Sequence, residues 1–439
     1  MHRAELPRKL GLVDATAIVV GTVIGSAIFL VPASIARSLP SASLILLLWM
    51  LSGGLSFFGA LAYAELGAMM PATGGQYVYL REAYGPLLGF LNGWASFLVI
   101  QSGAIATLAA GFSIYLSYFI PLGPVGTKLA SVLLIAVLTL VNYGGVRLGA
   151  GVQRLFTFLK VAGIGVVVAS AFLSPRHIET ASAATSPGFA WTRFGAAMIA
   201  CLWAYEGWSS LSFVAGEVKR PERNLLLGLG LGTAGLIAIY LSANLAYLRV
   251  LSLPAIRASD RVAASAAEAT MGHIGGTLVS LTILLSIIGA SNGSILTSAR
   301  IYFAQARDGL FFKSVGDIHP RFETPHIAIA VQGIWAVVLA LSGSYEVLFS
   351  YVIFTAWIFY GLTVLAVIVL RHKAPDLARP YKMWGYPVTP LAFAGIAFWF
   401  VINTIITTPG SSLIGLSIVA AGIPVYYFWR RSARPNSFL

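Results

Sequence analysis

The sequence has few charged residues for its length. Of its 439 residues only 10% are Asp, Glu, Lys or Arg, whereas 58% are hydrophobic. A soluble domain carries about 25% charged residues to solvate its surface. Apolar stretches of about 20 residues, each long enough to cross a hydrocarbon core of about 30 Å, recur along the whole chain. The scarcity of charge therefore excludes a soluble globular protein and predicts an integral membrane protein.

Patterns that carry enzyme chemistry are also scarce. Cys201 is the single cysteine, so no intrachain disulfide can form. The six histidines show no metal-ligand spacing, and Ser26 has no candidate base nearby in sequence. No loop is long enough to form a soluble domain. We therefore expect no catalytic residues, no metal and no cofactor, and we place the function inside the apolar bundle.

Twelve apolar spans are expected, with both termini in the cytoplasm. They cover about residues 12–38, 42–69, 86–119, 126–143, 151–173, 191–216, 225–249, 272–306, 326–342, 346–370, 388–407 and 411–430. With the N-terminus inside, 20 of the 28 lysines and arginines fall in cytoplasmic segments and 7 fall outside. This asymmetry follows the positive-inside rule. The net charge of +13 thus reflects topology signals and predicts no nucleic-acid partner.

Glycines interrupt the first span near its centre. Gly21 and Gly25 lie four residues apart and are followed by Ser26. Gly costs about 1 kcal/mol relative to Ala in a helix interior, so the pair permits local unwinding. Backbone groups freed in this way are tolerated in a membrane only when buried in protein or lining a polar cavity, and their partial charges suit a zwitterion. A GxxxG packing face is the alternative, which this span alone leaves open.

The sixth span carries a second candidate interruption. Glu206 and Gly207 lie in its middle, flanked by Trp203, Tyr205 and Trp208. An ionisable residue at that depth is costly unless it faces a cavity or a partner, so it indicates a functional site. A channel would instead need a repeated filter or rings of charge, and we find neither in the sequence. The two interruptions together favour a solute carrier.

The two interruptions are five spans apart, and an odd offset reverses orientation in the membrane. This arrangement is typical of inverted five-helix repeats that bind a solute at their interface. We therefore expect a single transmembrane transporter domain over residues 1–439. Its first repeat would cover about 12–173, its second about 191–370, and additional helices about 388–430.

Six segments spread over nearly the whole chain carry a resemblance to a known family. They are Gly21–Phe29, Glu65–Tyr77, Arg81–Pro86, Ala204–Pro221, Ser291–Arg300 and Trp384–Pro387. In their order and spacing they resemble the amino acid–polyamine–organocation (APC) superfamily, most closely a prokaryotic-type member of its L-type amino acid transporter (LAT) branch. The resemblance implies an all-α, LeuT-like fold. Two inverted five-helix repeats would be followed by two further helices, with spans one and six unwound at mid-membrane.

The resemblance also implies Na⁺-independent exchange of amino acids by alternating access. The backbone near Ser26 and Ala27 would hold the substrate carboxylate. Carbonyls near Val23, Trp203 and Glu206 would hold the α-ammonium, and Trp203 would act as an aromatic lid. The remaining candidates are the substrate-contacting Gly25 and Gly207 and, in supporting positions, Tyr205, Ser210, Ser291 and Asn292.

Lys160 lies alone inside the fifth span. Its stem could carry the ammonium to the cytoplasmic interface, a snorkelling position that the residues alone leave open. The resemblance implies instead that the ammonium substitutes for the ion at a site where related transporters bind sodium. A desolvated lysine able to lose its proton would couple transport to H⁺. Our hypothesis is a permanently charged structural cation that links span one to span eight.

Two positions depart from the family pattern. Ala27 stands where a glycine is usual, and its methyl group would narrow the pocket or favour small substrates. Glu206 stands where relatives often have glycine or aspartate. Its carboxyl group could pair with a cationic substrate, be protonated and donate a hydrogen bond, or balance Lys160. We expect neutral L-amino acids of small to medium size, with exchange of cationic amino acids through Glu206 as the alternative.

The loop between spans three and four, residues 120–128, contains no cysteine. Animal members of the branch attach a glycoprotein subunit through a cysteine in this loop, so we expect no disulfide-linked heavy subunit. The expected partners are amino acid substrates and the lipid bilayer of the cell membrane. H⁺-coupled symport stays open beside exchange, because the two differ only in whether the empty carrier reorients.

Overall fold

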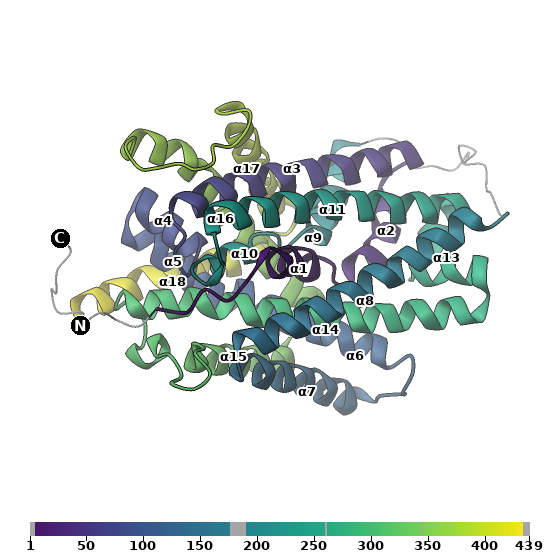
Figure 1. Ribbon diagram of the computed structural model, residues 1–439. Helices are drawn as coiled ribbons and strands as arrows, with labels where there is room; N and C mark the ends of the chain where they lie inside the picture. Colours follow the sequence, from purple (N-terminus) through teal and green to yellow (C-terminus); the bar gives the residue numbers. More distant parts are fainter. Residues whose placement is uncertain (1–4, 176–189, 260, 344, 433–439) are drawn as a thin grey trace.

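The computed structural model describes residues 5–175, 190–259, 261–343 and 345–432. Within these ranges the regular structure is helical, apart from one parallel bridge between Leu10 and Val218. The longest helices run side by side along one direction of the bundle (Figure 1). The predicted all-helical, multi-pass architecture is therefore confirmed.

The first half of the chain contributes α1 to α8. Their bounds are α1 Leu12–Val23, α2 Ala27–Ser38, α3 Ala42–Met69, α4 Gln76–Tyr84, α5 Pro86–Ala95, the π-helical turn η1 Ser96–Ile100, α6 Gln101–Leu116, α7 Pro124–Tyr143 and α8 Val146–Leu173. The second half contributes α9 Trp191–Ala204, α10 Ser210–Phe213, η2 Ala215–Glu217, α11 Pro221–Val250, α12 Leu253–Ala258, α13 Val262–Met271, α14 His273–Arg307, η3 Lys313–Gly316, α15 His326–Ser342, α16 Tyr345–Lys373, α17 Val388–Thr407 and α18 Pro409–Ser432.

Nine helical segments of the described chain are long and apolar enough to cross a membrane, and the bent pair α1–α2 makes a tenth. The helix α15 is apolar but has only 17 residues. The helix α9 ends at Ala204 after 14 residues, because the sixth span is broken there. Ten spans are therefore supported by length and composition, and the full count of twelve stays a prediction.

Small side chains let the long helices approach one another closely. Ser52, Ser56, Ala60 and Ala64 are all buried on α3, which packs against α11. A side chain at Gly53 would lie 2.7 Å from the Tyr205 hydroxyl, so only glycine fits there. The equivalent stripe on α14, which packs against α8, consists of the buried residues Ser286, Ala290, Ser294 and Ser298. Close backbone approach of this kind holds helices together where lipid supplies no hydrophobic force.

Three short α-helices were not predicted, because they are too short or too polar to read as spans. They are α4, α12 and α13. The segment that leads into α1 and the C-terminal end of α18 lie at the same end of the bundle, and α13 lies at the opposite end (Figure 1). This agrees with an even number of crossings. Which end faces the cytoplasm stays a prediction.

Candidate functional site

The first span is broken after Val23. The helix α1 ends there, α2 begins at Ala27, and the two axes are bent by 43°. Ser26 is the N-cap of α2 but makes no side-chain cap bond. The first amide groups of α2 therefore have no partner within their helix and carry a partial positive charge.

The two glycines of this span have different environments. A side chain at Gly21 would lie 2.1 Å from the Thr157 hydroxyl on α8, so Gly21 is a packing glycine. Gly25 lies within the break, where the nearest atom to an added Cβ is a Leu108 methyl at 3.4 Å. The packing interpretation therefore applies to Gly21, and the unwinding interpretation applies to Gly25.

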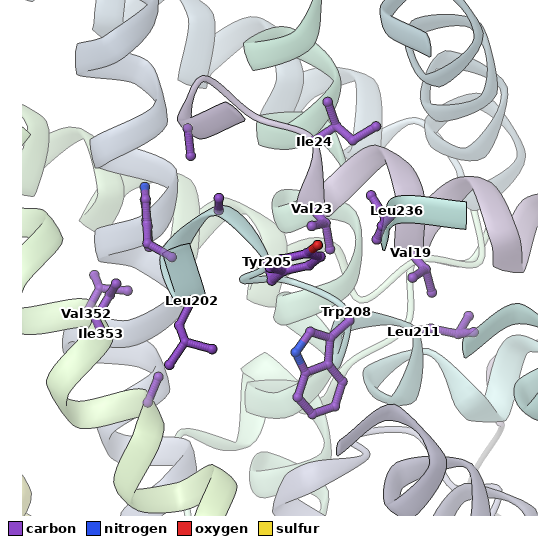
Figure 2. Packing of buried hydrophobic residues seen from close by; sticks show 14 of the residues in the cluster. Val19, Val23, Ile24, Leu202, Tyr205, Trp208, Leu211, Leu236, Val352 and Ile353 are labelled. Atoms are coloured by element: carbon purple, nitrogen blue, oxygen red, sulfur yellow. The ribbon is translucent and has the colours of Figure 1, made fainter. Parts of the chain in front are cut away.

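The second break lies directly against the first. The helix α9 ends at Ala204, and α10 begins at Ser210. Gly207 has φ = 112°, and a Cβ there would lie 3.1 Å from a Thr22 methyl group. The Tyr240 hydroxyl lies 2.8 Å from the Ala204 carbonyl and 3.2 Å from the Val23 carbonyl, so it joins the C-terminal ends of α1 and α9 (Figure 2 shows the packing around these ends).

A cavity of about 50 Å³ lies between the two breaks. All seven predicted substrate contacts line it, together with one supporting candidate, namely Val23, Gly25, Ser26, Ala27, Trp203, Glu206, Gly207 and Ser210. The structure adds lining residues that were not predicted, which are Thr22, Ile100, Gln101, Ala104, Leu108, Ser294 and Val352. A cavity of this size holds a few water molecules and suits a small polar solute.

Five polar side chains in the cavity wall lack a protein partner within the described chain, and one of them is the buried hydroxyl of Thr22. Ser26, Gln101, Ser210 and Ser294 are only 3%, 8%, 3% and 5% exposed. Their side chains make no hydrogen bond within the described ranges. Buried polar groups in proteins nearly always have a hydrogen-bond partner, in protein or in water. The wall is therefore arranged for a ligand, or water in its place, that supplies several hydrogen bonds.

Glu206 has a partner from another helix. The Tyr360 hydroxyl on α16 donates to the Glu206 carboxylate and also lies 3.1 Å from the Ser209 hydroxyl. No ion pair joins Glu206 and Lys160 among the residues that the structure describes. Of the three roles left open for Glu206, a direct ion pair with Lys160 is therefore not supported by these contacts, and the other two stay open.

Lys160 is fully buried inside the bundle. Its ammonium lies 2.8 Å from the Gly21 carbonyl, 2.6 Å from the Ile24 carbonyl and 2.8 Å from the Ser286 carbonyl. Three donors thus meet three acceptors. A side chain at Gly289 would lie 3.0 Å from the ammonium, so glycine leaves room for it. The lysine connects α8 to the broken end of α1 and to α14, and it does not reach the bundle surface as a snorkelling lysine would.

Three supporting candidates lie outside the cavity. The Tyr205 hydroxyl donates to the Trp49 carbonyl at 3.2 Å, behind the second break. Asn292 donates to Gln153 Oε1 at 2.9 Å, within a buried network between α14 and α8. The Ser291 hydroxyl is buried without a partner in the described chain. Of the motif Ser291-Asn292-Gly293-Ser294, only Ser294 reaches the cavity.

Two of the missed lining residues carried a sequence signal. Gln101 is a polar side chain in the middle of the third apolar span, where it needs a partner or a cavity. Ser294 belongs to the small-residue stripe of α14. The sequence does not show which members of this stripe pack against another helix and which face a cavity. The remaining missed residues are ordinary apolar side chains, apart from Thr22, and only the fold brings them to the site.

The sequence matches the family described as amino acid permease over residues 10–428. The chain belongs to the amino acid permease family. The permease is 35% identical to the serine/threonine exchanger SteT of Bacillus subtilis (strain 168), over 97% of this chain and 98% of that protein. It is 33% identical to the human b(0,+)-type amino acid transporter 1, over 97% and 88% of the two chains. With the human cystine/glutamate transporter it shares 30% identity, over 98% and 86%. These matches confirm the predicted membership of the APC superfamily and its LAT branch.

Proposed function

We propose that this permease is a Na⁺-independent exchanger of neutral L-amino acids of small to medium size, which works by alternating access. The observation that carries the proposal is the small cavity between two broken helices, whose wall holds polar side chains without protein partners. Opposite helix ends meet at this cavity. An amino acid is a small zwitterion, so its two charged groups match the two kinds of helix end.

The carboxylate would bind at the start of α2. Ser26 and Ala27 line the cavity there, and the first amide groups of a helix are free donors at its positive end. The Ser26 hydroxyl, which caps nothing in its own helix, supplies a further donor. The Ala27 methyl group takes space beside this position, which favours a small substrate.

The α-ammonium would bind where α1 and α9 end. Val23 and Trp203 line the cavity at these two ends, where helix carbonyls carry partial negative charge. The Glu206 carboxyl group faces the same cavity and is held by Tyr360. The Trp203 side chain would cover the bound substrate as a lid.

The position of Lys160 supports independence from sodium. A ring of backbone carbonyls at the broken end of α1 and on α14 would suit a monovalent cation, and the ammonium already occupies it. A fixed cation there removes the need for a bound ion. Lys160 would then hold the first break to the rest of the bundle throughout the cycle.

Several further properties belong to the same proposal. The two breaks would lie in inverted repeats of about residues 12–173 and 191–370, with additional helices at about 388–430. The permease would reside in the cell membrane with both ends in the cytoplasm, and it would work without a disulfide-linked heavy subunit. It would be a transporter without enzymatic activity.

Counterflow in proteoliposomes tests the proposed function. The purified permease is reconstituted without Na⁺, and uptake of radiolabelled L-alanine is measured with and without internal L-alanine at two pH values. We expect internal amino acid to stimulate uptake by about tenfold or more, because exchange needs a loaded carrier for each return step. Uptake without internal substrate that is driven by an inward H⁺ gradient would favour H⁺-coupled symport.

The same assay tests the charge of the substrate. L-Arginine is added as a competitor of L-alanine uptake, to the wild type and to Glu206→Gln, which keeps an acceptor for Tyr360. We expect arginine to compete weakly in both, since the Glu206 carboxylate is already engaged. Strong competition in the wild type that is lost in Glu206→Gln would establish a cationic substrate.

A further inference from the structure

The third long span changes its helical pitch at the cavity. The π-helical turn η1 ends at Ile100, and α6 begins at the next residue, Gln101. A π-turn inserts a residue into the helix and redirects the side chains that follow, and such turns occur frequently at functional sites. Here the turn brings two consecutive residues, Ile100 and Gln101, to the same cavity.

The Gln101 amide is the polar group that α6 contributes to the cavity. The side chain is more than nine-tenths buried, and its amide makes no hydrogen bond within the part of the chain that the structure describes. A primary amide has two N–H donors and one carbonyl acceptor, so it can pair with a hydroxyl group or with another amide. An unpaired amide at this depth is costly, which points to a ligand that pairs with it.

The rest of this wall is apolar. Ala104 and Leu108 follow Gln101 on α6, and Val352 approaches from α16. The charged ends of the substrate are assigned to α2, α1 and α9, so this wall is where its side chain would lie. The Ser294 hydroxyl on α14 is another polar group of the same cavity without a protein partner. The whole cavity has a volume of about 50 Å³, which favours an amino acid with a short side chain.

We propose that Gln101 is a specificity-determining residue, whose amide hydrogen-bonds to the side chain of a short hydroxyl- or carboxamide-bearing amino acid. This inference rests on the proposed exchange of neutral amino acids and narrows its substrate class to serine, threonine and asparagine. An apolar substrate of the same size leaves the Gln101 amide unpaired. A site built to hydrogen-bond a substrate group rejects the analogue that lacks this group.

Competition by paired amino acids tests the assignment. Counterflow of radiolabelled L-alanine is measured in proteoliposomes of the full chain, with increasing L-serine or L-alanine outside, because the two differ by a single hydroxyl group. L-Asparagine and L-leucine form a second pair of similar shape. In the wild type we expect the polar member of each pair to compete about tenfold better, the ratio that one net hydrogen bond supports.

Three variants then separate the amide from its surroundings. Gln101→Met has similar length and volume but no amide, and we expect the serine-to-alanine ratio to fall to about one while alanine counterflow continues. Gln101→Asn keeps a shorter amide and should give an intermediate ratio. Ser102→Ala alters the neighbouring buried residue, which does not line the cavity, and should keep the wild-type ratio.

The outcomes distinguish this inference from the proposed function. Alanine counterflow by Gln101→Met with an unchanged serine preference overturns the role of Gln101 and leaves the exchanger intact. A wild type that takes alanine and leucine as well as serine and asparagine also overturns it. Absence of counterflow with any neutral amino acid in the wild type overturns the proposed function itself. If Gln101→Met does not fold, the ratio measured for Gln101→Asn decides, and an unchanged ratio there contradicts the inference.

Discussion

At the scale of single residues, Lys160 is where the structure makes the sharpest statement. Its single ammonium group donates to three carbonyl groups, of Gly21, Ile24 and Ser286, each at hydrogen-bond distance. A buried charge is tolerated only when it is paired or fully hydrogen-bonded, and here carbonyl dipoles do this without a carboxylate. The conformation of the first break therefore depends on a residue of another helix.

Replacing Lys160 by alanine should impair transport strongly. The variant leaves three buried carbonyls without a donor, and the broken end of α1 loses its link to α8 and α14. We expect the rate of alanine counterflow per reconstituted protein to fall by about tenfold or more. Lys128→Ala, which removes an exposed lysine on α7, is the matched control and should retain the wild-type rate.

The proposed role of Lys160 as a fixed cation also has a consequence for proton coupling. If the ammonium stays charged, counterflow by the wild type should not require a proton gradient. A Lys160→Ala variant that is unaltered in both affinity and rate contradicts the structural role. A wild type whose uptake follows an imposed H⁺ gradient contradicts the fixed charge and leaves the link itself in place.

The site was predictable from sequence where the chemistry is local. A broken helix is indicated by Gly25, Ser26 and Gly207, which lie at the two breaks. Glycine and serine lower the stability of a helix, so their presence in an apolar span is a signal that the sequence shows. Gln101 and Tyr360 reach the same site from helices distant in sequence. The sequence around each of them does not indicate which residues it meets there. Pairings across the bundle depend on how helices pack, which the periodicity of a single span does not encode.

At the scale of elements, an ion pair joins the segment after the sixth span to α14. Arg300 and Glu217 are both fully buried, with guanidinium-to-carboxylate distances of 2.7 and 3.0 Å. The Glu217 carbonyl also accepts hydrogen bonds from the amides of Lys9 and Leu10, which precede α1. One residue thus ties the chain before the first broken span to the chain after the second. The segments that adjoin the two broken spans are therefore connected to each other and to α14 through Glu217.

Breaking this ion pair should destabilise the fold. Glu217→Ala leaves the Arg300 guanidinium buried without its partner, which costs about 3–5 kcal/mol. We expect a clear drop in the thermal unfolding midpoint of the purified permease in detergent, followed by tryptophan fluorescence. The double variant Glu217→Leu with Arg300→Leu removes both charges and should recover most of the loss. A double variant as unstable as Glu217→Ala would show that packing, not the uncompensated charge, decides.

The apolar spans were predictable as elements, but their internal irregularities were not all predictable. The expected ranges 42–69, 326–342 and 388–407 coincide with α3, α15 and α17, because long apolar runs have one stable form in lipid. The π-turn η1 leaves no mark in the sequence, since its residues Ser96–Ile100 are ordinary for a helix. The short helices α12 and α13 lack the length that makes a span recognisable.

At the scale of the whole molecule, charge asymmetry and architecture are consistent. The described beginning and end of the chain lie at one end of the bundle (Figure 1). Residues expected in cytoplasmic segments gather there in ion pairs, such as Lys9 with Glu323 and Arg81 with Asp308. On the positive-inside rule we expect that end to face the cytoplasm. Hydropathy and charge alone could predict this orientation, because both act on the chain as it inserts and not on its final packing.

Labelling of single cysteines would establish the orientation. Cys201 is fully buried, so the wild type gives little background with a maleimide that does not cross membranes. Lys128→Cys and Lys313→Cys place thiols at exposed positions before the start of α7's apolar core and after α14, on segments expected outside and inside. In intact cells we expect label at position 128 only, and at position 313 only after permeabilisation. The reverse pattern would turn the whole bundle over and place the proposed substrate path in the opposite direction, because the rule that orients one loop orients every span that follows.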